Sequence, residues 1–254
     1  ELSGELSRLR AKLCEHRLQD FEQATLAWEQ SLTVDSEHPE ALKALTGLYD
    51  KQQRWSDLVT ILETRVDIEP DDYELRTLLG ELIVRVSGDA QRAIEQWKLV
   101  LMDHPQAEGA RKMLESYLSQ SDFVDEISMT LEPIYQEAEE WSAMIELNMS
   151  LLQYSQDLDP VRREELWTEC GSLYAERLNA QEKALEAYTE AFMINPIEPE
   201  IRERLLPLVE ALEAWVTFAP KLSEAIQQIT DPDQLVEDYL RLATWAEERL
   251  NDQE

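Results

Sequence analysis

The sequence predicts an all-α protein, a right-handed α-solenoid of antiparallel helix hairpins, and three observations support this class. Ala, Leu, Glu and Gln dominate the 254 residues, and all four are good helix formers. Gly and Pro, which interrupt helices, occur only six and ten times. Similar segments recur along the chain, which is the pattern of a repeat protein whose units pack on their neighbours.

Apolar residues at helical spacing and prolines near segment ends predict fourteen helices. They span residues 3–17, 20–33, 39–52, 55–67, 71–86, 89–103, 106–119, 122–138, 141–155, 161–178, 181–194, 198–213, 215–229 and 232–251. Within 122–138, Pro133 is expected to open or kink the helix. The interval from Ala93 to Ala184 is longer than that from Ala24 to Ala93, which indicates one additional helix between Pro105 and Trp141.

Three segments share a packing pattern: an Ala, an aromatic residue four positions later, and a small or β-branched residue three positions after that. This spacing places all three side chains on one helix face. The triples are Ala24/Trp28/Ser31, Ala93/Trp97/Val100 and Ala184/Tyr188/Ala191. In the preceding helices, Gly80 and Gly171 lie mid-helix, where Gly costs ~1 kcal/mol relative to Ala. We therefore expect a neighbouring helix to cross closely at each glycine.

These residues resemble the tetratricopeptide repeat (TPR), whose unit is a pair of antiparallel helices. The strongest window, Glu164 to Pro196, carries the family's residues in order: Trp167, Gly171, Tyr174, Ala184, Tyr188, Ala191 and Pro196. Windows 39–70 and 73–105 are looser copies. The resemblance implies a TPR-like superhelix that forms one continuous array over residues 1–254.

A second type of hairpin alternates with the first and is marked by Trp55, Trp141 and Trp215. This alternation resembles the long TPR arrays of large bacterial proteins, myxobacterial ones especially. The expected hairpins are approximately 1–35, 39–69, 71–104, 106–138 (irregular), 141–159 (with the extra helix), 161–195, 198–230 and 232–254 (truncated).

The last eight residues, EERLNDQE, repeat the stretch that precedes a second helix in the window around Leu178. We therefore expect the chain to be cut from a longer array, with a final helix that has lost its mate. That helix is expected to expose an apolar stripe and to drive end-to-end self-association. The stripe consists of Leu235, Tyr239, Leu242, Trp245 and Ala246.

The charge is strongly acidic, with 54 acidic against 23 basic residues and a net charge of −31. Such a chain repels nucleic acid and anionic membranes, and favours basic or neutral partners. A solvated acidic surface is the plainer alternative. No run of 18 apolar residues predicts a membrane span. The first ten residues lack the apolar core of a signal peptide, which favours the cytoplasm, although a parent chain could carry a signal elsewhere.

The sequence predicts no catalytic, cofactor-binding or metal-binding residues, and hence no enzyme. Nucleophile and phosphate-loop motifs are missing, and His16, His38 and His104 lack partners at ligand spacing. Acidic clusters at 70–72, 122–126 and 231–233 are expected to cap helices. Cys14 and Cys170 fall in apolar helical patterns and are expected to be reduced and buried. An all-α metal-dependent enzyme stays a remote alternative.

The resemblance implies that a ligand contacts positions 2, 5, 9 and 12 of the first helix in each hairpin. The candidates are Glu40, Lys43, Asp50, Glu74, Thr77, Glu81, Glu165, Thr168 and Ser172, with Trp167 and Trp245 bordering the groove. The other five tryptophans are expected in the core. Some family members clamp a carboxylate there with Lys and Asn, but Gly47 stands where the Asn belongs. The recurring Glu favours a basic or amphipathic helical peptide instead.

These observations predict a non-catalytic protein–protein interaction scaffold that captures a peptide or a partner domain on its concave face. The alternative is a purely architectural spacer within a larger multi-repeat protein, which sets distance and curvature without binding anything. A contiguous apolar patch in the groove favours the first function, and a groove that is hydrated throughout favours the second.

Overall fold

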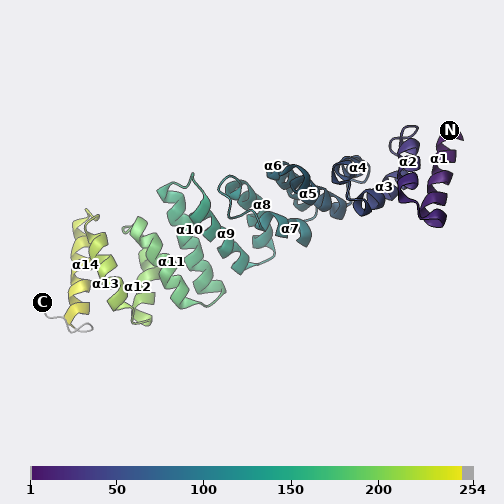
Figure 1. The fold of residues 1–254 in the computed structure, drawn as a ribbon. Helices are drawn as coiled ribbons and strands as arrows, with labels where there is room; N and C mark the ends of the chain where they lie inside the picture. The colour runs from purple at the N-terminus through teal and green to yellow at the C-terminus, as the bar shows by residue number, and fades with distance from the viewer. Residues whose placement is uncertain (1, 248–254) are drawn as a thin grey trace. The chain divides into compact units, whose positions relative to one another are not determined.

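The computed structural model describes residues 2–247, which form fourteen α-helices and two short π-helical turns, with no strand in that range. The chain divides into two compact units, Glu1–Tyr117 and Leu118–Glu254, which we describe separately (Figure 1). The all-α class predicted from the sequence is confirmed. The final segment of the predicted helix 232–251 and the EERLNDQE repeat lie largely outside the described residues.

The N-terminal unit consists of three helix hairpins followed by one short helix. Its helices are α1 (Leu2–Leu13), α2 (Phe21–Leu32), α3 (Pro39–Lys51), α4 (Trp55–Ile68), α5 (Tyr73–Ser87), α6 (Ala90–Asp103) and α7 (Glu108–Glu115), with a π-helical turn, η1, over Cys14–Leu18. The hairpins are α1–α2, α3–α4 and α5–α6, and the second helix of each of the first two also packs on the first helix of the next. This is the stacking of a repeat array.

The C-terminal unit repeats this arrangement. Its helices are α8 (Val124–Glu137), α9 (Trp141–Tyr154), α10 (Pro160–Ser172), α11 (Gln181–Ile194), α12 (Pro199–Ala211), α13 (Trp215–Ile226) and α14 (Pro232–Trp245), with a π-helical turn, η2, over Leu173–Arg177. The hairpins are α8–α9, α10–α11 and α12–α13, and α14 packs on α13. Pro133 neither opens nor ends a helix as predicted: α8 continues through it. Because Pro133 is exposed, the carbonyl that loses its partner there lies on the solvent side.

Two hairpins, α5–α6 and α10–α11, close around the predicted glycines, and we call them the glycine hairpins. A Cβ at Gly80 would lie 2.4 Å from Trp97 Nε1, and one at Gly171 would lie 2.7 Å from Tyr188 ring atoms. Both aromatic side chains are buried, with 1% of their surface exposed. The expected crossing is therefore confirmed, because only a residue without a Cβ lets the second helix approach so closely.

Three further hairpins, α3–α4, α8–α9 and α12–α13, begin the second helix with Trp55, Trp141 and Trp215 respectively, and we call them the tryptophan hairpins. These three side chains are only partly buried, so they are not the fully buried core residues that were expected, although Trp215 packs against the core of the C-terminal unit. The first residue of a helix lies beside the turn, so fewer neighbouring side chains cover these tryptophan rings. Trp28 and Trp97, deep within second helices, are buried as expected.

A left-handed residue closes each turn between a first and a second helix. In the tryptophan hairpins, the residue before the Trp donates its backbone N–H to the carbonyl five residues earlier, as Arg54 does to Tyr49 at 2.9 Å. Among the described residues, those with positive φ are Gln19, Gln53, Gly88, Glu139, Asn179 and Glu213. Only one of the six is Gly, so five residues with a side chain hold a conformation that favours glycine.

Candidate functional site

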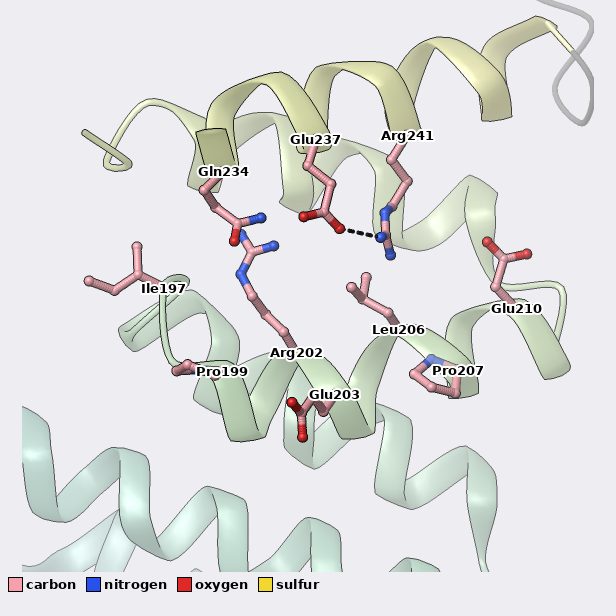
Figure 2. A pocket seen from close by; sticks show the side chains of 10 residues that line it. All are labelled: Ile197, Pro199, Arg202, Glu203, Leu206, Pro207, Glu210, Gln234, Glu237 and Arg241. Carbon is pink, nitrogen blue, oxygen red and sulfur yellow. Dashed lines mark hydrogen bonds and ion pairs between the residues drawn. The ribbon is translucent and has the colours of Figure 1, made fainter. Parts of the chain in front are cut away.

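A pocket in the C-terminal unit lies between two first helices, α12 and α14. It has a volume of about 550 Å³ and opens between the two helices (Figure 2). Ile197, Pro199, Leu206 and Pro207 supply its apolar lining. This is the face of the first helices on which the sequence placed a ligand.

A buried ion pair forms the floor of this pocket and links α12 to α14. Arg202 donates from Nη1 and Nη2 to the two carboxylate oxygens of Asp238, at 2.9 and 2.7 Å. Its Nε donates to the Pro196 carbonyl at 2.5 Å, and its guanidinium lies 5.4 Å from the centre of the Phe192 ring. Since both side chains are buried and every charge on the floor is matched, the floor offers a ligand no net charge.

The walls of the pocket carry carboxylates. Glu210 accepts hydrogen bonds from the indole N–H groups of Trp215 and Trp245, at 3.0 and 2.9 Å. Glu237 pairs with Arg241 one turn further along α14, at 2.9 Å. Glu203 is exposed and has no ion-pair partner within residues 2–247. The pocket therefore combines an apolar strip with one free carboxylate.

A second pocket, in the N-terminal unit, brings together three of the predicted residues. Glu74, Thr77 and Glu81 of α5 line a cavity of about 470 Å³, which Tyr73 and Leu78 share with residues 106–109. The two glutamates are exposed, whereas Thr77 is buried and donates from its hydroxyl to the Tyr73 carbonyl. The two carboxylates are thus available to a ligand, and Thr77 contributes little surface.

A third pocket, of about 320 Å³, lies beside Trp141 in the C-terminal unit, and the predicted residue Ser172 is part of its lining. Glu132, Glu169 and Glu176 supply three carboxylates there. Three of the pockets in the described part of the chain thus lie along first helices, and all three are acidic.

The remaining predicted residues are scattered. Glu40 pairs with Lys12 at 2.6 Å, and Glu165 pairs with Arg162 at 3.1 Å. Lys43 and Asp50 are exposed on α3.

Trp167 is partly buried and packs against the apolar core of α11–α14 and that around Val124. Thr168 is also partly buried, and its hydroxyl has no hydrogen-bond partner.

The expected apolar stripe of the last helix is wrong. Trp245 is buried, with 3% of its surface exposed, and its ring meets the Phe218 ring edge-on at 6.2 Å. Leu235 and Leu242 pack into the same core. Trp245 therefore cannot border a groove. Tyr239 is exposed as expected, and the other exposed large apolar side chains of α14 are Val236 and Leu240.

None of the residues that line the α12–α14 pocket was among the site residues predicted from the sequence. The positions 2, 5, 9 and 12 of α12, counted from Pro199, are Glu200, Glu203, Pro207 and Glu210, and the last three line the pocket. Applying the same register to this helix would have found them. The weaker repeat pattern of α12 hid that signal.

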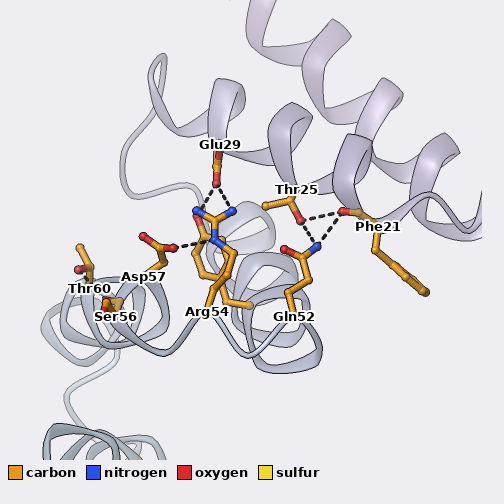
Figure 3. A network of polar contacts seen from close by, with 9 residues as sticks. Phe21, Thr25, Glu29, Gln52, Arg54, Ser56, Asp57 and Thr60 are labelled. Carbon is orange, nitrogen blue, oxygen red and sulfur yellow. Dashed lines mark hydrogen bonds and ion pairs between the residues drawn. The ribbon is translucent and has the colours of Figure 1, made fainter. Parts of the chain in front are cut away.

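A polar network ties α2, α3 and α4 together and shows how the turns are held (Figure 3). Glu29 accepts from the Tyr49 hydroxyl at 2.9 Å and from Arg54 Nη1 at 3.0 Å. Arg54 also donates from Nε to Asp57 at 2.6 Å and covers the Tyr49 ring. Burial and the Glu29 carboxylate raise the pKa of Tyr49 above its ordinary value. The network therefore has a structural role.

Cys14 and Cys170 are both free and buried, as expected. Burial raises the pKa of the Cys170 thiol to about 12, so the thiol stays protonated at neutral pH and does not act as a nucleophile. Asp72 and Asp231 cap α5 and α14 as predicted. Within residues 2–247, no group of three or more His, Cys, Asp or Glu side chains is placed to hold a metal ion. No helix in that range has the length and apolarity to cross a membrane.

No protein-family model matches the chain, and no curated protein matches it significantly. Solved structures of TPR proteins do resemble it. A Parabacteroides merdae TPR protein shares 11% identity over 95% of this chain and 99% of its own, with a TM-score of 0.40. The TPR2AB domain of yeast Sti1, solved as a complex with pHSP90, shares 12% over 94% and 98%, with a TM-score of 0.34. YrrB, described as a TPR protein with an unusual peptide-binding site, shares 16% over 78% and 89%, at 0.35.

At these TM-scores the fold assignment rests on the hairpins themselves. Helix pairs, the Gly–aromatic crossing and the stacking of each second helix on the next first helix are the features of a TPR array. The chain is thus an all-α TPR-like repeat protein. Its bacterial, myxobacterial-like origin stays a prediction.

Proposed function

We propose that this protein is a non-catalytic interaction scaffold whose first helices capture a basic, amphipathic peptide segment. The α12–α14 pocket is the observation that carries the proposal: an apolar strip of Ile197, Leu206 and Pro207 lies beside the free carboxylate of Glu203. An apolar side chain of the partner would fill the pocket, and an adjacent Lys or Arg would pair with Glu203. The net charge of −31 would attract such a partner from a distance.

The other first-helix pockets support the same chemistry. Glu74 and Glu81 present carboxylates in the N-terminal unit, beside Tyr73 and Leu78. We propose Glu40, Lys43, Asp50 and Glu165 only as weaker, peripheral contacts, because Glu40 and Glu165 already hold partners of their own. Engaging them would require breaking an existing surface pair, which contributes little but is not free.

Binding of a labelled amphipathic helical peptide tests this function. The polar face of the peptide carries Arg and Lys, and a second peptide carries Glu in their place. Glu203→Lys, or Glu74→Lys with Glu81→Lys, should weaken binding of the basic peptide roughly three- to tenfold at low ionic strength. Glu95→Lys and Glu224→Lys, on exposed positions of the second helices α6 and α13, are charge-matched controls.

Equal losses in the groove variants and in the controls would mean that only total charge matters. In that case the groove is not the binding site. Failure of both peptides to bind at any ionic strength would favour the architectural spacer, which needs no ligand.

We also propose self-association through α14, on a face that shares Tyr239 with the stripe predicted from the sequence and adds Val236 and Leu240. Val236, Tyr239 and Leu240 are 59%, 60% and 64% exposed and lie within one and a half turns of each other. Burying such side chains against a second copy stabilises an assembly by the hydrophobic effect. Light scattering over a concentration series should show association that Leu240→Ser abolishes and that Met129→Ser, at an exposed residue of α8, leaves unchanged.

A further inference from the structure

Trp141 carries one of the chain's own cations on its accessible ring face. It is the first residue of α9 and is partly buried, and the Arg177 guanidinium lies 4.8 Å from its ring centre. Arg177 is exposed and makes no ion pair within residues 2–247, although carboxylates lie close by. A planar guanidinium stacks well on an indole ring, so the face is shaped for this group.

The pocket beside this ring has an excess of negative charge. Its volume is about 320 Å³, and Glu132, Glu169 and Glu176 contribute carboxylates to the lining. Glu169 accepts a hydrogen bond from Asn148 Nδ2 at 3.0 Å, and Glu176 pairs with Arg204 at 2.6 Å. Glu132 has no hydrogen-bond or ion-pair partner in the described part of the chain. Glu132 and Glu169 therefore both lack a positively charged partner in the described part of the chain, and Glu169 has only a hydrogen bond from an amide.

The chemistry of the lining selects for a cation with a flat, delocalised charge. An anion would meet three carboxylates, and a neutral side chain would gain nothing from them. A lysine ammonium would feel the charges but would not stack over the whole ring. Met144 and Leu173 supply apolar surface against which the methylene stem of a long side chain would pack.

We propose that this pocket binds an arginine side chain of a partner protein. In the free protein Arg177 occupies the Trp141 ring face, and the partner's arginine displaces it on binding. The proposal names a cationic subsite for the peptide capture proposed above, and it rests on that function for the identity of its ligand. Arg177 lies at the end of η2, directly before the turn at Asn179, so its side chain has open solvent to move into.

A matched control exists in the N-terminal unit. Arg85 lies 4.4 Å from the ring centre of Trp55, the first residue of α4, so the same stack occurs there. Tyr135 of α8 and Tyr49 of α3 occupy equivalent positions in the two hairpins. Glu132 lies three residues before Tyr135, whereas Thr46 lies three residues before Tyr49. The Thr46 hydroxyl donates to the Leu42 carbonyl at 2.8 Å. The stack at Trp55 therefore lacks this free carboxylate.

The test uses N-acetyl-arginine methylamide as the probe, followed through the Trp141 indole N–H resonance of the full chain. N-acetyl-citrulline methylamide has the same shape without the charge. Arg177→Gln should tighten binding of the arginine probe three- to tenfold, because it frees the ring and removes a competing cation. Trp141→Ala and Glu132→Gln should each weaken it at least threefold. Arg85→Gln should leave the dissociation constant within twofold of that of the unaltered chain.

Equal binding of the citrulline probe, or unchanged or weaker binding by Arg177→Gln, would overturn the proposal. So would an equal gain from Arg85→Gln, since that gain would reflect net charge alone. If Trp141→Ala does not fold, Glu132→Gln on the exterior of the core decides the question. The probe is a single amino acid, so Glu203→Lys should not affect it. If the chain binds the basic peptide but Arg177→Gln does not change binding of the arginine probe, only this subsite is refuted. If the chain binds the arginine probe but not the basic peptide, only the proposed function is refuted.

Discussion

The hairpins α10–α11 and α8–α9 place their buried aromatic side chains on opposite helices. In the glycine hairpin α10–α11, Tyr188 of the second helix lies over Gly171 of the first. In the tryptophan hairpin α8–α9, the buried aromatic residue is Tyr135 of the first helix, and Trp141 of the second helix is only partly buried. The same helix pairing is thus closed in two ways.

This difference separates stability from binding. A Cβ at Gly171 would lie 2.7 Å from the Tyr188 ring, so this ring is tightly packed and presents no face to a ligand. The Trp141 ring is only partly buried, and one of its faces carries the Arg177 guanidinium. Within the C-terminal unit, the glycine hairpin α10–α11 lies between the tryptophan hairpins α8–α9 and α12–α13 and packs on both.

Removing the buried aromatic side chain should have the largest effect on stability. Tyr188→Ala should lower the free energy of unfolding by ~3–5 kcal/mol, because a large cavity opens beside Gly171. Trp141→Ala should lower it by less, since that side chain is only partly buried. Denaturant unfolding of the two variants measures the ratio. Equal losses would contradict the division between the two hairpin types.

Replacing a glycine by alanine should have the next largest effect on stability, and its sign should differ between the two types of hairpin. Gly171→Ala should lower the free energy of unfolding by ~1–3 kcal/mol, because its Cβ would overlap the Tyr188 ring. The control is Gly47→Ala in α3 of a tryptophan hairpin, where a Cβ would have no neighbour within 4 Å. That change should raise stability by ~0.5–1 kcal/mol, since Ala is the better helix former. If both changes stabilise, the crossing at Gly171 is looser than described.

Alkaline pH should weaken the glycine hairpin through Cys170. Its folded pKa of about 12 is raised by burial, so the folded state keeps the proton while the unfolded state loses it above the ordinary thiol pKa. The contribution is therefore complete at low pH and falls as pH rises toward 12. Between pH 8 and pH 10 it should decline by ~1 kcal/mol. Cys170→Ala should flatten this slope, and unfolding curves of the two proteins at several pH values measure the difference.

Relieving a turn of a tryptophan hairpin should have the smallest effect. Glu139 has a φ of 54° between α8 and α9, which a side chain tolerates poorly. Glu139→Gly should raise stability by roughly 0.5 kcal/mol, the difference between relief of strain and added freedom of the unfolded chain. Gly88→Ala, in the turn of a glycine hairpin with a φ of 71°, should lower stability by a similar amount. A loss for Glu139→Gly would mean that the Glu side chain itself supports the turn.

Most of the fold was predictable because it depends on local signals. Helical periodicity located all fourteen helices, and the cost of a mid-helix Gly pointed to the crossings at Gly80 and Gly171. The caps at Asp72 and Asp231 followed from residue type and position. Each of these signals is contained within a few neighbouring residues.

The site was less predictable because it depends on which face of a helix meets a neighbour. On α14, Tyr239 and Trp245 belong to one predicted stripe, yet Trp245 packs against Phe218 of α13 whereas Tyr239 is exposed. The pair Arg202–Asp238 joins residues 36 positions apart, and no short-range pattern links them. Glu74 and Glu81 were found because α5 follows the family register, and Glu203 was missed because α12 follows it weakly.

The Arg202–Asp238 pair also has a geometric consequence. Apolar contacts between helices are not directional, so they tolerate small shifts of one helix along another better than hydrogen bonds do. The Arg202 guanidinium donates two parallel hydrogen bonds to the Asp238 carboxylate, and this arrangement requires the planes of the two groups to be aligned. The Arg202–Asp238 pair therefore favours a single alignment of α14 along α12, the two helices between which the pocket lies.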